Sequence, residues 1–443
     1  MENKKMGVMQ LTIITAINMM GSGIIMLPAN LAQVGTISIL SWLVTAIGAM
    51  FIAYGFSQAG MFTRKGGGMG GLAEYSYGKA GAFMANYNYG ISCLVTNVAI
   101  ATSVVGYLDA LFKWNQTPIE IVLTIILILV LSTILNFGGA GITGRISNFT
   151  ILGILVPVGV IIFGGWFWFH PAMYVAAWNP HHYGLFSGLG KSISITLWAF
   201  LGLESAAVNM DKVENPKKNL PIAVLGGTIG AAILYILSTN IVQGIVPNLD
   251  LASSTAPFGL VFAHMFNPTI GSIVIGLMII SCFGSLTTWQ FTQAELFRSS
   301  AQEGYYPNIF KKVTSHEVPI MGMIIALIIE AVMAFSSISP NLSAQFTLLV
   351  NLAVITNVIP YILSMGSLRT MQQIDGTSSP KKQSRNTVVA FVAGVYSVYA
   401  ITQAGTQAIV MSAVVILFGW TLYGLMSPKF DVPKSVMVLE KTK

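Results

Sequence analysis

The chain has 443 residues, of which 54% are hydrophobic and only 8% are charged, and its formal net charge is +7. Soluble globular proteins carry roughly 25% charged residues, so this composition excludes an ordinary soluble enzyme and indicates a polytopic membrane protein. The excess of basic residues does not indicate nucleic acid binding, because their placement follows the expected membrane topology.

The first apolar run is interrupted by Gly21, Ser22 and Gly23. It lacks a clear small-residue cleavage site, so we expect a retained first helix rather than a secretion signal. Breaking a span frees backbone N–H and C=O groups, which a membrane tolerates only where they line a cavity. The freed N–H groups suit a substrate carboxylate. Close helix packing through small residues is the alternative.

Further apolar segments follow, and together they fit about twelve spans. If the N-terminus is cytoplasmic, every Lys and Arg except Lys113 and Lys191 falls on the cytoplasmic side. This asymmetry follows the positive-inside rule, so we expect an even number of spans and both termini in the cytoplasm. The expected segments are residues 11–20 with 24–33, 37–58, 82–112, 118–137, 148–169, 187–208, 221–246, 270–297, 319–338, 346–365, 388–401 and 408–425.

The sixth segment is interrupted at Gly202 and also carries Glu204. Paired breaks at corresponding positions of two halves point to a transporter whose binding site lies between inverted repeats. A carboxylate at the centre of a span costs about 2.5–3.5 kcal/mol on insertion scales. Because no obvious Lys or Arg lies in the expected membrane interior, this acid predicts a cationic substrate, a proton or both. A protonated glutamate bonded to a backbone carbonyl is the alternative.

Two more acids and several aromatic residues are candidates. Glu330 lies in an apolar segment, where a functional acid and a helix–helix contact are both open. Glu74 lies where the chain re-enters the membrane, and an exit-path role competes with a helix cap or a salt bridge. Aromatic rings can hold an ammonium group or gate a cavity, whereas packing and interfacial anchoring are the alternatives. The aromatic candidates are Tyr87, Tyr89, Trp198, Trp289, Trp420 and Tyr423.

Signals for other chemistry are weak. Cys93 and Cys282 lie in apolar runs and suggest neither a disulfide framework nor a metal site, so we expect small core residues. Residues 184–192 imitate a phosphate-binding loop but have Leu185 at its required glycine, which argues against nucleotide binding. No nucleophile elbow or zinc signature favours an intramembrane enzyme. A cation channel would need a continuous selectivity path, which one chain with two broken helices fits poorly.

Several motifs resemble a known family. The segments MMGSGII (19–25), GGMGG (67–71) and WAFLGLES (198–205) resemble the amino acid–polyamine–organocation superfamily, and within it the basic amino acid/polyamine antiporters. The resemblance runs nearly end to end, although Ala59 replaces a cysteine of the most similar members, whose role is not carried over. The remaining matching segments are WNPHH (178–182), VENP (213–216), STAPFG (254–259) and GWTLYGL (419–425).

The resemblance implies an all-α membrane protein with about twelve transmembrane helices in a five-plus-five inverted repeat, broken in helices 1 and 6. The repeats would cover residues 11–169 and 187–365, followed by two extra helices in 388–425, all within one transporter domain of residues 1–443.

The implied activity is exchange of putrescine for ornithine by alternating access in the bacterial inner membrane. No metal or cofactor is expected, and the implied partners are the diamine, the basic amino acid and the lipid bilayer. Lysine–cadaverine exchange, arginine–agmatine exchange, proton-coupled putrescine uptake and a homodimer are left open.

The resemblance also implies roles for individual residues. Trp198 would gate the bound side chain, and Glu204 would be an acidic site near the cytoplasmic exit, with Glu74 further along that route. Trp289, Tyr89 and Tyr423 match aromatic positions linked to polyamine handling or gating. The full set of expected substrate-binding residues is Gly21, Ser22, Gly23, Ile24, Tyr89, Trp198, Gly202, Glu204 and Trp289, and the expected exit-path or gating residues are Glu74, Tyr87, Trp420 and Tyr423.

Overall fold

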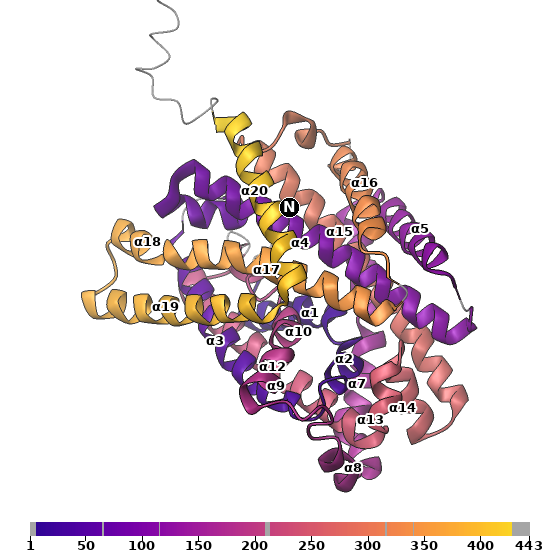
Figure 1. Ribbon diagram of the computed structural model, residues 1–443. Helices are drawn as coiled ribbons and strands as arrows, with labels where there is room; N and C mark the ends of the chain where they lie inside the picture. Colours follow the sequence, from indigo (N-terminus) through magenta and orange to yellow (C-terminus); the bar gives the residue numbers. More distant parts are fainter. Residues whose placement is uncertain are drawn as a thin grey trace, which may run out of the picture.

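The computed structural model in Figure 1 is a bundle of helices. The structure describes residues 6–63, 66–114, 116–208, 213–314, 317–339 and 341–427. Over these residues it contains helices and loops but no strand, and an isolated β-bridge pairs Met6 with Val213. The predicted all-helical architecture is therefore confirmed for the described part of the chain.

The helices follow the apolar segments of the sequence, because a backbone in lipid must satisfy its own hydrogen bonds. They are α1 (Val8–Gly23), α2 (Leu27–Ala32), α3 (Ser38–Phe62), α4 (Gly68–Phe112), α5 (Pro118–Asn136), α6 (Ala140–Thr150), α7 (Leu152–Gly164), α8 (Pro171–Ala176), α9 (Leu185–Lys191), α10 (Ile193–Trp198), α11 (Ser205–Val208), α12 (Pro216–Ile245), α13 (Asn248–Ser253), α14 (Pro257–Met265), α15 (Pro268–Gln302), α16 (Ile320–Ser336), α17 (Leu342–Gly366), α18 (Leu368–Asp375), α19 (Pro380–Gln403) and α20 (Thr406–Met426), with short 3₁₀ helices η1 (Gly165–Trp168) and η3 (Asn308–Lys311).

Among the described residues, 8 helical stretches are long and apolar enough to cross a membrane. The other predicted segments form helices that are shorter, as in α1 and α16, or more polar at one end, as in α19. Helix α4 consists of two helical segments that meet at Gly78, where the backbone is not helical (φ 60°, ψ −157°). The predicted third span, from residue 82, corresponds to the second segment, and the sequence did not predict the first, from Gly68. The stretch before residue 82 carries Glu74 and Lys79, so an apolar window does not detect it.

Helix α4 lies at the centre of the bundle and packs against both α15 and α17. Within its most apolar window 89% of the residues are buried, compared with 11% for α20, which lies on the periphery and crosses in front of α17 in Figure 1. Polar side chains buried on α4 bond within the protein, as when the Thr102 hydroxyl donates to the Val98 carbonyl at 2.8 Å. The centre of the bundle is therefore polar enough to hold a site.

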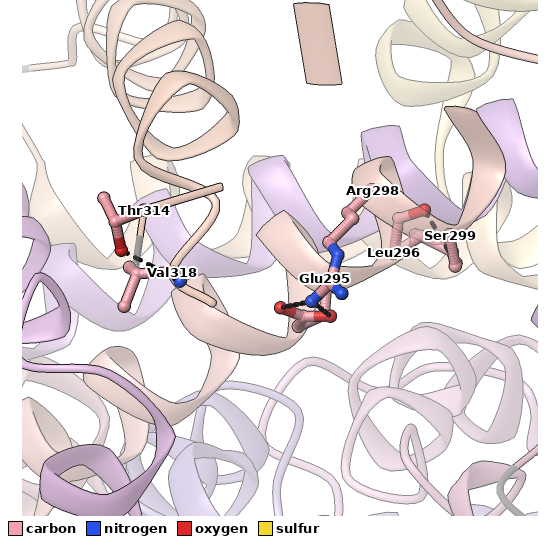
Figure 2. Close-up of polar contacts among 6 residues, drawn as sticks. All are labelled: Glu295, Leu296, Arg298, Ser299, Thr314 and Val318. Carbon is pink, nitrogen blue, oxygen red and sulfur yellow. Dashed lines mark hydrogen bonds and ion pairs between the residues drawn. The ribbon is translucent and has the colours of Figure 1, made fainter. Parts of the chain in front are cut away.

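Figure 2 shows the C-terminal end of α15 and the loop that leads to α16. Arg298 donates to both carboxylate oxygens of Glu295 at 3.3 Å. The Val318 N–H bonds to the Thr314 hydroxyl at 3.3 Å and turns the loop toward α16. A partly exposed pair such as Arg298–Glu295 contributes about 0–1 kcal/mol, so it orients the end of the helix more than it stabilises the fold.

Candidate functional site

Two helix interruptions face each other in the bundle. Helix α1 ends at Gly23 and α2 begins at Leu27, so the first break lies at residues 24–26, immediately after the predicted glycines. The glycines themselves form the last turn of α1, which corrects the predicted position of the break. Ile24 is fully buried within the break, and its carbonyl accepts from the Leu27 N–H at 3.3 Å. The backbone of Gly21 and Ser22 is helical, and the Ser22 side chain lies outside the described part of the structure.

The glycines have a packing role. A Cβ atom on Gly23 would lie 3.1 Å from the Ala199 Cα atom, so this glycine allows the two interrupted segments to approach closely. The second break separates α10 from α11, and Gly202 within it has φ +104°, where a Cβ atom would also lie 3.0 Å from the Asn18 carbonyl oxygen. The small residues therefore have both of the roles considered above: they accompany the breaks in the helices, and they allow the helices to pack closely. The Asn18 amide donates to the Ser205 hydroxyl at 2.9 Å and ties α1 to α11.

Glu204 lies in the second break and is completely buried. Tyr89 of α4 donates to its Oε1 at 2.8 Å, and Tyr361 of α17 donates to its Oε2 at 2.5 Å. The Gly202 N–H donates to the same Oε2 at 3.0 Å. In the described part of the chain no Lys or Arg forms a salt bridge with this carboxyl. Neutral donors therefore satisfy an acid that the sequence left without a partner.

A small cavity lies between the two breaks. Its volume is about 10 Å³, which is room for about one water molecule. Trp198 closes one side and packs edge-on against Phe346, with ring centroids 5.2 Å apart. Trp289 and Asn18 also border a second cavity of about 30 Å³, which is lined mainly by hydroxyl groups of α6 and α15. The lining of the first cavity is Asn18, Met19, Gly23, Ser92, Cys93, Thr96, Trp198, Leu201, Trp289 and Asn357.

The structure thus brings Gly23, Trp198 and Trp289 together around the cavity. Glu204 and Tyr89 do not line it, but Leu201 of the same break and Cys93, one turn after Tyr89 on α4, do. Sequence reasoning missed the other polar residues of this centre. Tyr361 and Asn357 lie four apart on α17, a spacing that places them on one face, but their contact with α10–α11 is long-range. Cys93, four residues after Tyr89, is buried as expected but also lines the cavity.

Other predicted aromatics lie elsewhere. Tyr87 donates to the Val415 carbonyl at 3.0 Å and stacks on Phe83, with centroids 6.0 Å apart. Phe83 contacts Tyr423 at 5.4 Å, and Tyr423 contacts the exposed Trp420 at 5.9 Å. These residues form a separate cluster between α4 and α20, and none of them lines the central cavity.

Glu74 forms a third, separate group. Lys79 lies 3.0 Å from its carboxylate, and the Tyr305 hydroxyl donates to it at 2.9 Å. The Glu74–Lys79 pair is the salt bridge that the sequence left as an alternative, and it lies within α4. The Tyr305 bond joins this part of α4 to the loop after α15. Burial, together with the bond to Glu74, raises the pKa of the Tyr305 hydroxyl.

Comparison with known proteins places the chain in a family. Residues 6–418 match the amino acid permease family. The chain is 57% identical to the putrescine transporter PotE of Haemophilus influenzae over 98% of its own length and 99% of that protein's. It is 56% identical to PotE of Escherichia coli K12, over 97% and 98% of the two chains. It is 32% identical to the cadaverine/lysine antiporter of E. coli K12, over 82% of each chain. The chain therefore belongs to the amino acid permease family, whose members are transporters rather than enzymes.

Proposed function

We propose that the protein carries putrescine across the membrane and exchanges it for ornithine by alternating access. The observation that carries the proposal is Glu204, a fully buried carboxyl in the second helix break that two tyrosine hydroxyls hold. Leu201 of the same break lines a small cavity together with Trp198 and Trp289. Such a centre attracts an ammonium group through both the carboxylate and the indole faces. The names of the two relatives that are more than half identical support putrescine as one substrate.

The two proposed substrates use different parts of the site. Ornithine carries a carboxylate, for which the backbone N–H groups of residues 24–26, between α1 and α2, are the candidate donors. Gly21, Ser22 and Gly23 form the helical turn that leads into this break. Putrescine has two ammonium groups and no carboxylate, so it depends on the side formed by Glu204. We assign Glu204 to ammonium binding, with Tyr89 and Gly202 holding its carboxylate in place, Trp198 to gating and Trp289 to the cavity wall. The exit-path and gating roles of Glu74, Tyr87, Trp420 and Tyr423 stay predictions, since these residues lie away from the cavity.

Alternating access is supported by the size of the cavity. A space for about one water molecule cannot hold a diamine, so the helices around it have to separate before either substrate enters. We propose about twelve spans, with repeats in residues 11–169 and 187–365 and two further helices in 388–425. We further propose cytoplasmic termini in a bacterial inner membrane, as the positive-inside rule indicates. The homodimer stays a prediction.

Counterflow in proteoliposomes tests the function. Vesicles loaded with ornithine, lysine, arginine or buffer alone are challenged with labelled external putrescine. We expect fast, saturable uptake only with internal ornithine. Equal stimulation by lysine would instead favour the activity of the 32% identical cadaverine/lysine antiporter. Uptake into empty vesicles driven by a proton gradient would replace exchange with proton-coupled uptake, and non-saturable flux would indicate a channel.

A further inference from the structure

A second buried carboxyl lies outside the proposed substrate site. Glu330 on α16 is 0% exposed, whereas Ile328 and Val332 on the same helix are 59% and 63% exposed. The helix therefore turns its apolar side outward and a carboxyl inward. Placing an acid at this depth costs about 2.5–3.5 kcal/mol on insertion scales, and intramembrane acids are usually functional.

Neutral amides surround this carboxyl. The Asn97 amide on α4 donates to Glu330 Oε1 at 2.8 Å, and the Gln290 amide on α15 donates to Oε2 at 3.0 Å. Asn97 also donates to Gln293 Oε1 at 2.5 Å. One carboxyl group thus joins three helices through side chains alone. We call Glu330, Asn97, Gln290 and Gln293 the amide cluster.

The amide cluster has unused hydrogen-bonding capacity. Asn97 Oδ1, Gln290 Oε1 and Gln293 Nε2 are buried without a hydrogen-bond partner. A side-chain amide exchanges its donor and acceptor ends by a half-turn. If Gln290 turns, its Oε1 accepts from a protonated Glu330, whereas its present orientation donates to the ionised form. The amide cluster can therefore form hydrogen bonds to Glu330 in both its ionised and its protonated form. A network that only stabilises the fold does not need this capacity.

The charged groups on the neighbouring helices make no described contact that would hold Glu330 in one protonation state. Helix α16 carries no other charged residue and packs on α4, α5, α15 and η3. The charged residues of α4 are Glu74, Lys79 and Asp109, of which Glu74 and Lys79 pair with each other, and no hydrogen bond or salt bridge described in the structure joins any of the three to Glu330. The charged residues of α5, of the end of α15 (Figure 2) and of η3 are Glu120, the Glu295–Arg298 pair and Lys311, and no hydrogen bond or salt bridge described in the structure joins any of them to Glu330.

The amide cluster is connected to the central cavity through two helices. Asn97 follows Thr96 on α4, and Gln290 follows Trp289 on α15, and both preceding residues line the cavity. A change in how α4 meets α15 at the cluster therefore moves two walls of the cavity.

We propose that Glu330 is a proton-binding residue, separate from Glu204, whose protonation sets the packing of α4 against α15 and so the rate at which the cavity opens. The step is the binding of one proton to the Glu330 carboxylate with rotation of the Gln290 amide. The rotation also gives up the hydrogen bond from Gln290 Nε2 to the Leu129 carbonyl, at 3.4 Å, and the O–H bond of the acid is the only covalent bond that forms. The proposal rests on the transport activity above and adds a site for its control by pH.

The test compares counterflow rates of purified variants from about pH 5 to about pH 9, a range that covers titration of a perturbed carboxyl. We expect the wild-type rate to change several-fold through one titration, and the rate of Glu330→Gln to be nearly constant because glutamine mimics the protonated acid. Glu330→Asp should restore a titration. Glu295→Gln, which removes an acid at the partly exposed end of α15, is the matched control and should retain the wild-type profile.

A profile of Glu330→Gln that coincides with the wild-type profile would overturn the proposal. If Glu330→Gln does not fold, Gln290→Met takes its place, because it removes one donor and leaves the acid. A shifted midpoint in that variant supports the proposal, and an unchanged midpoint overturns it. Failure here is distinguishable from failure of the proposed function, since in the latter case the wild-type protein shows no counterflow at any pH.

Discussion

The central residue of the site is a carboxyl bound by hydroxyl groups rather than by a cation. Tyr89 and Tyr361 donate to Glu204 from α4 and α17, and these bonds partly replace the water that a buried anion loses. A Lys or Arg partner would neutralise the acid and compete with an incoming ammonium group. Tyrosine hydroxyls leave the negative charge available, so this arrangement suits a cation-binding site better than a structural ion pair would.

Replacing Glu204 by glutamine tests this role. The change keeps the shape of the side chain but removes its charge, and hydrogen bonds to charged groups are worth about 1.5–3 kcal/mol. Since 1.4 kcal/mol is a factor of ten, we expect the KM for putrescine to rise about tenfold or more in counterflow assays. Glu120→Gln, an acid in the exposed cap of α5, is the matched control and should leave KM unchanged. An unaltered KM in Glu204→Gln would remove the main argument for cation recognition.

The sequence predicted Glu204 and one of its partners, Tyr89, but not the other, Tyr361. An acid in an apolar run stands out without any structure, because it conflicts with the composition around it. Tyr361 does not stand out, since tyrosine is common in membrane helices and its contact with Glu204 spans 157 residues. Tyr87 and Tyr423 were predicted as exit-path or gating residues, and this role stays a prediction. Tyr87 on α4 bonds to the Val415 carbonyl on α20, and Tyr423 on α20 contacts Phe83 on α4.

At the scale of elements, the two interrupted helices are built to fit each other. Gly23 faces the backbone at Ala199, and Gly202 faces the backbone at Asn18. The sequence predicted both interruptions because glycine and an acid within an apolar run are local signals. It placed the first break a few residues early, because the glycines serve the close approach at the end of α1 and the unwound residues follow them.

Alanine at position 202 tests this fit. The residue has φ +104°, and an alanine Cβ atom would lie 3.0 Å from the Asn18 carbonyl oxygen. Backbone strain of this kind costs about 1–3 kcal/mol, so we expect a lower melting temperature and slower counterflow. Gly230→Ala on α12 is the control, because nothing lies within 4 Å of its Cβ position and alanine favours a helix. Equal melting temperatures and equal counterflow rates of the two variants would show that the close contact at residue 202 does not matter for transport.

At the scale of the whole molecule, the proposed orientation assigns opposite ends of the bundle to opposite sides of the membrane. Lys113 follows the end of α4, and Lys312 follows η3, and both side chains are exposed. The two native cysteines are buried, so they give little background with an impermeant thiol reagent.

We expect Lys113→Cys to react with such a reagent in intact cells, and Lys312→Cys to react only after the membrane is opened. Labelling is measured by mass shift of the purified protein, with the wild-type chain as control. Reaction of both positions from the same side would contradict the proposed number of spans between them. Reaction with the sides reversed would invert the orientation and leave the span count intact.

The closed cavity has a consequence for any ligand of this protein. Because its volume of about 10 Å³ admits no diamine, a ligand binds only to the fraction of molecules that has opened. The apparent dissociation constant is then the intrinsic constant divided by that fraction. A substitution that weakens the packing of the helices would therefore strengthen apparent binding, even if the substituted residue does not contact the ligand. An inhibitor that holds the helices apart would outcompete a substrate that makes better contacts with the site.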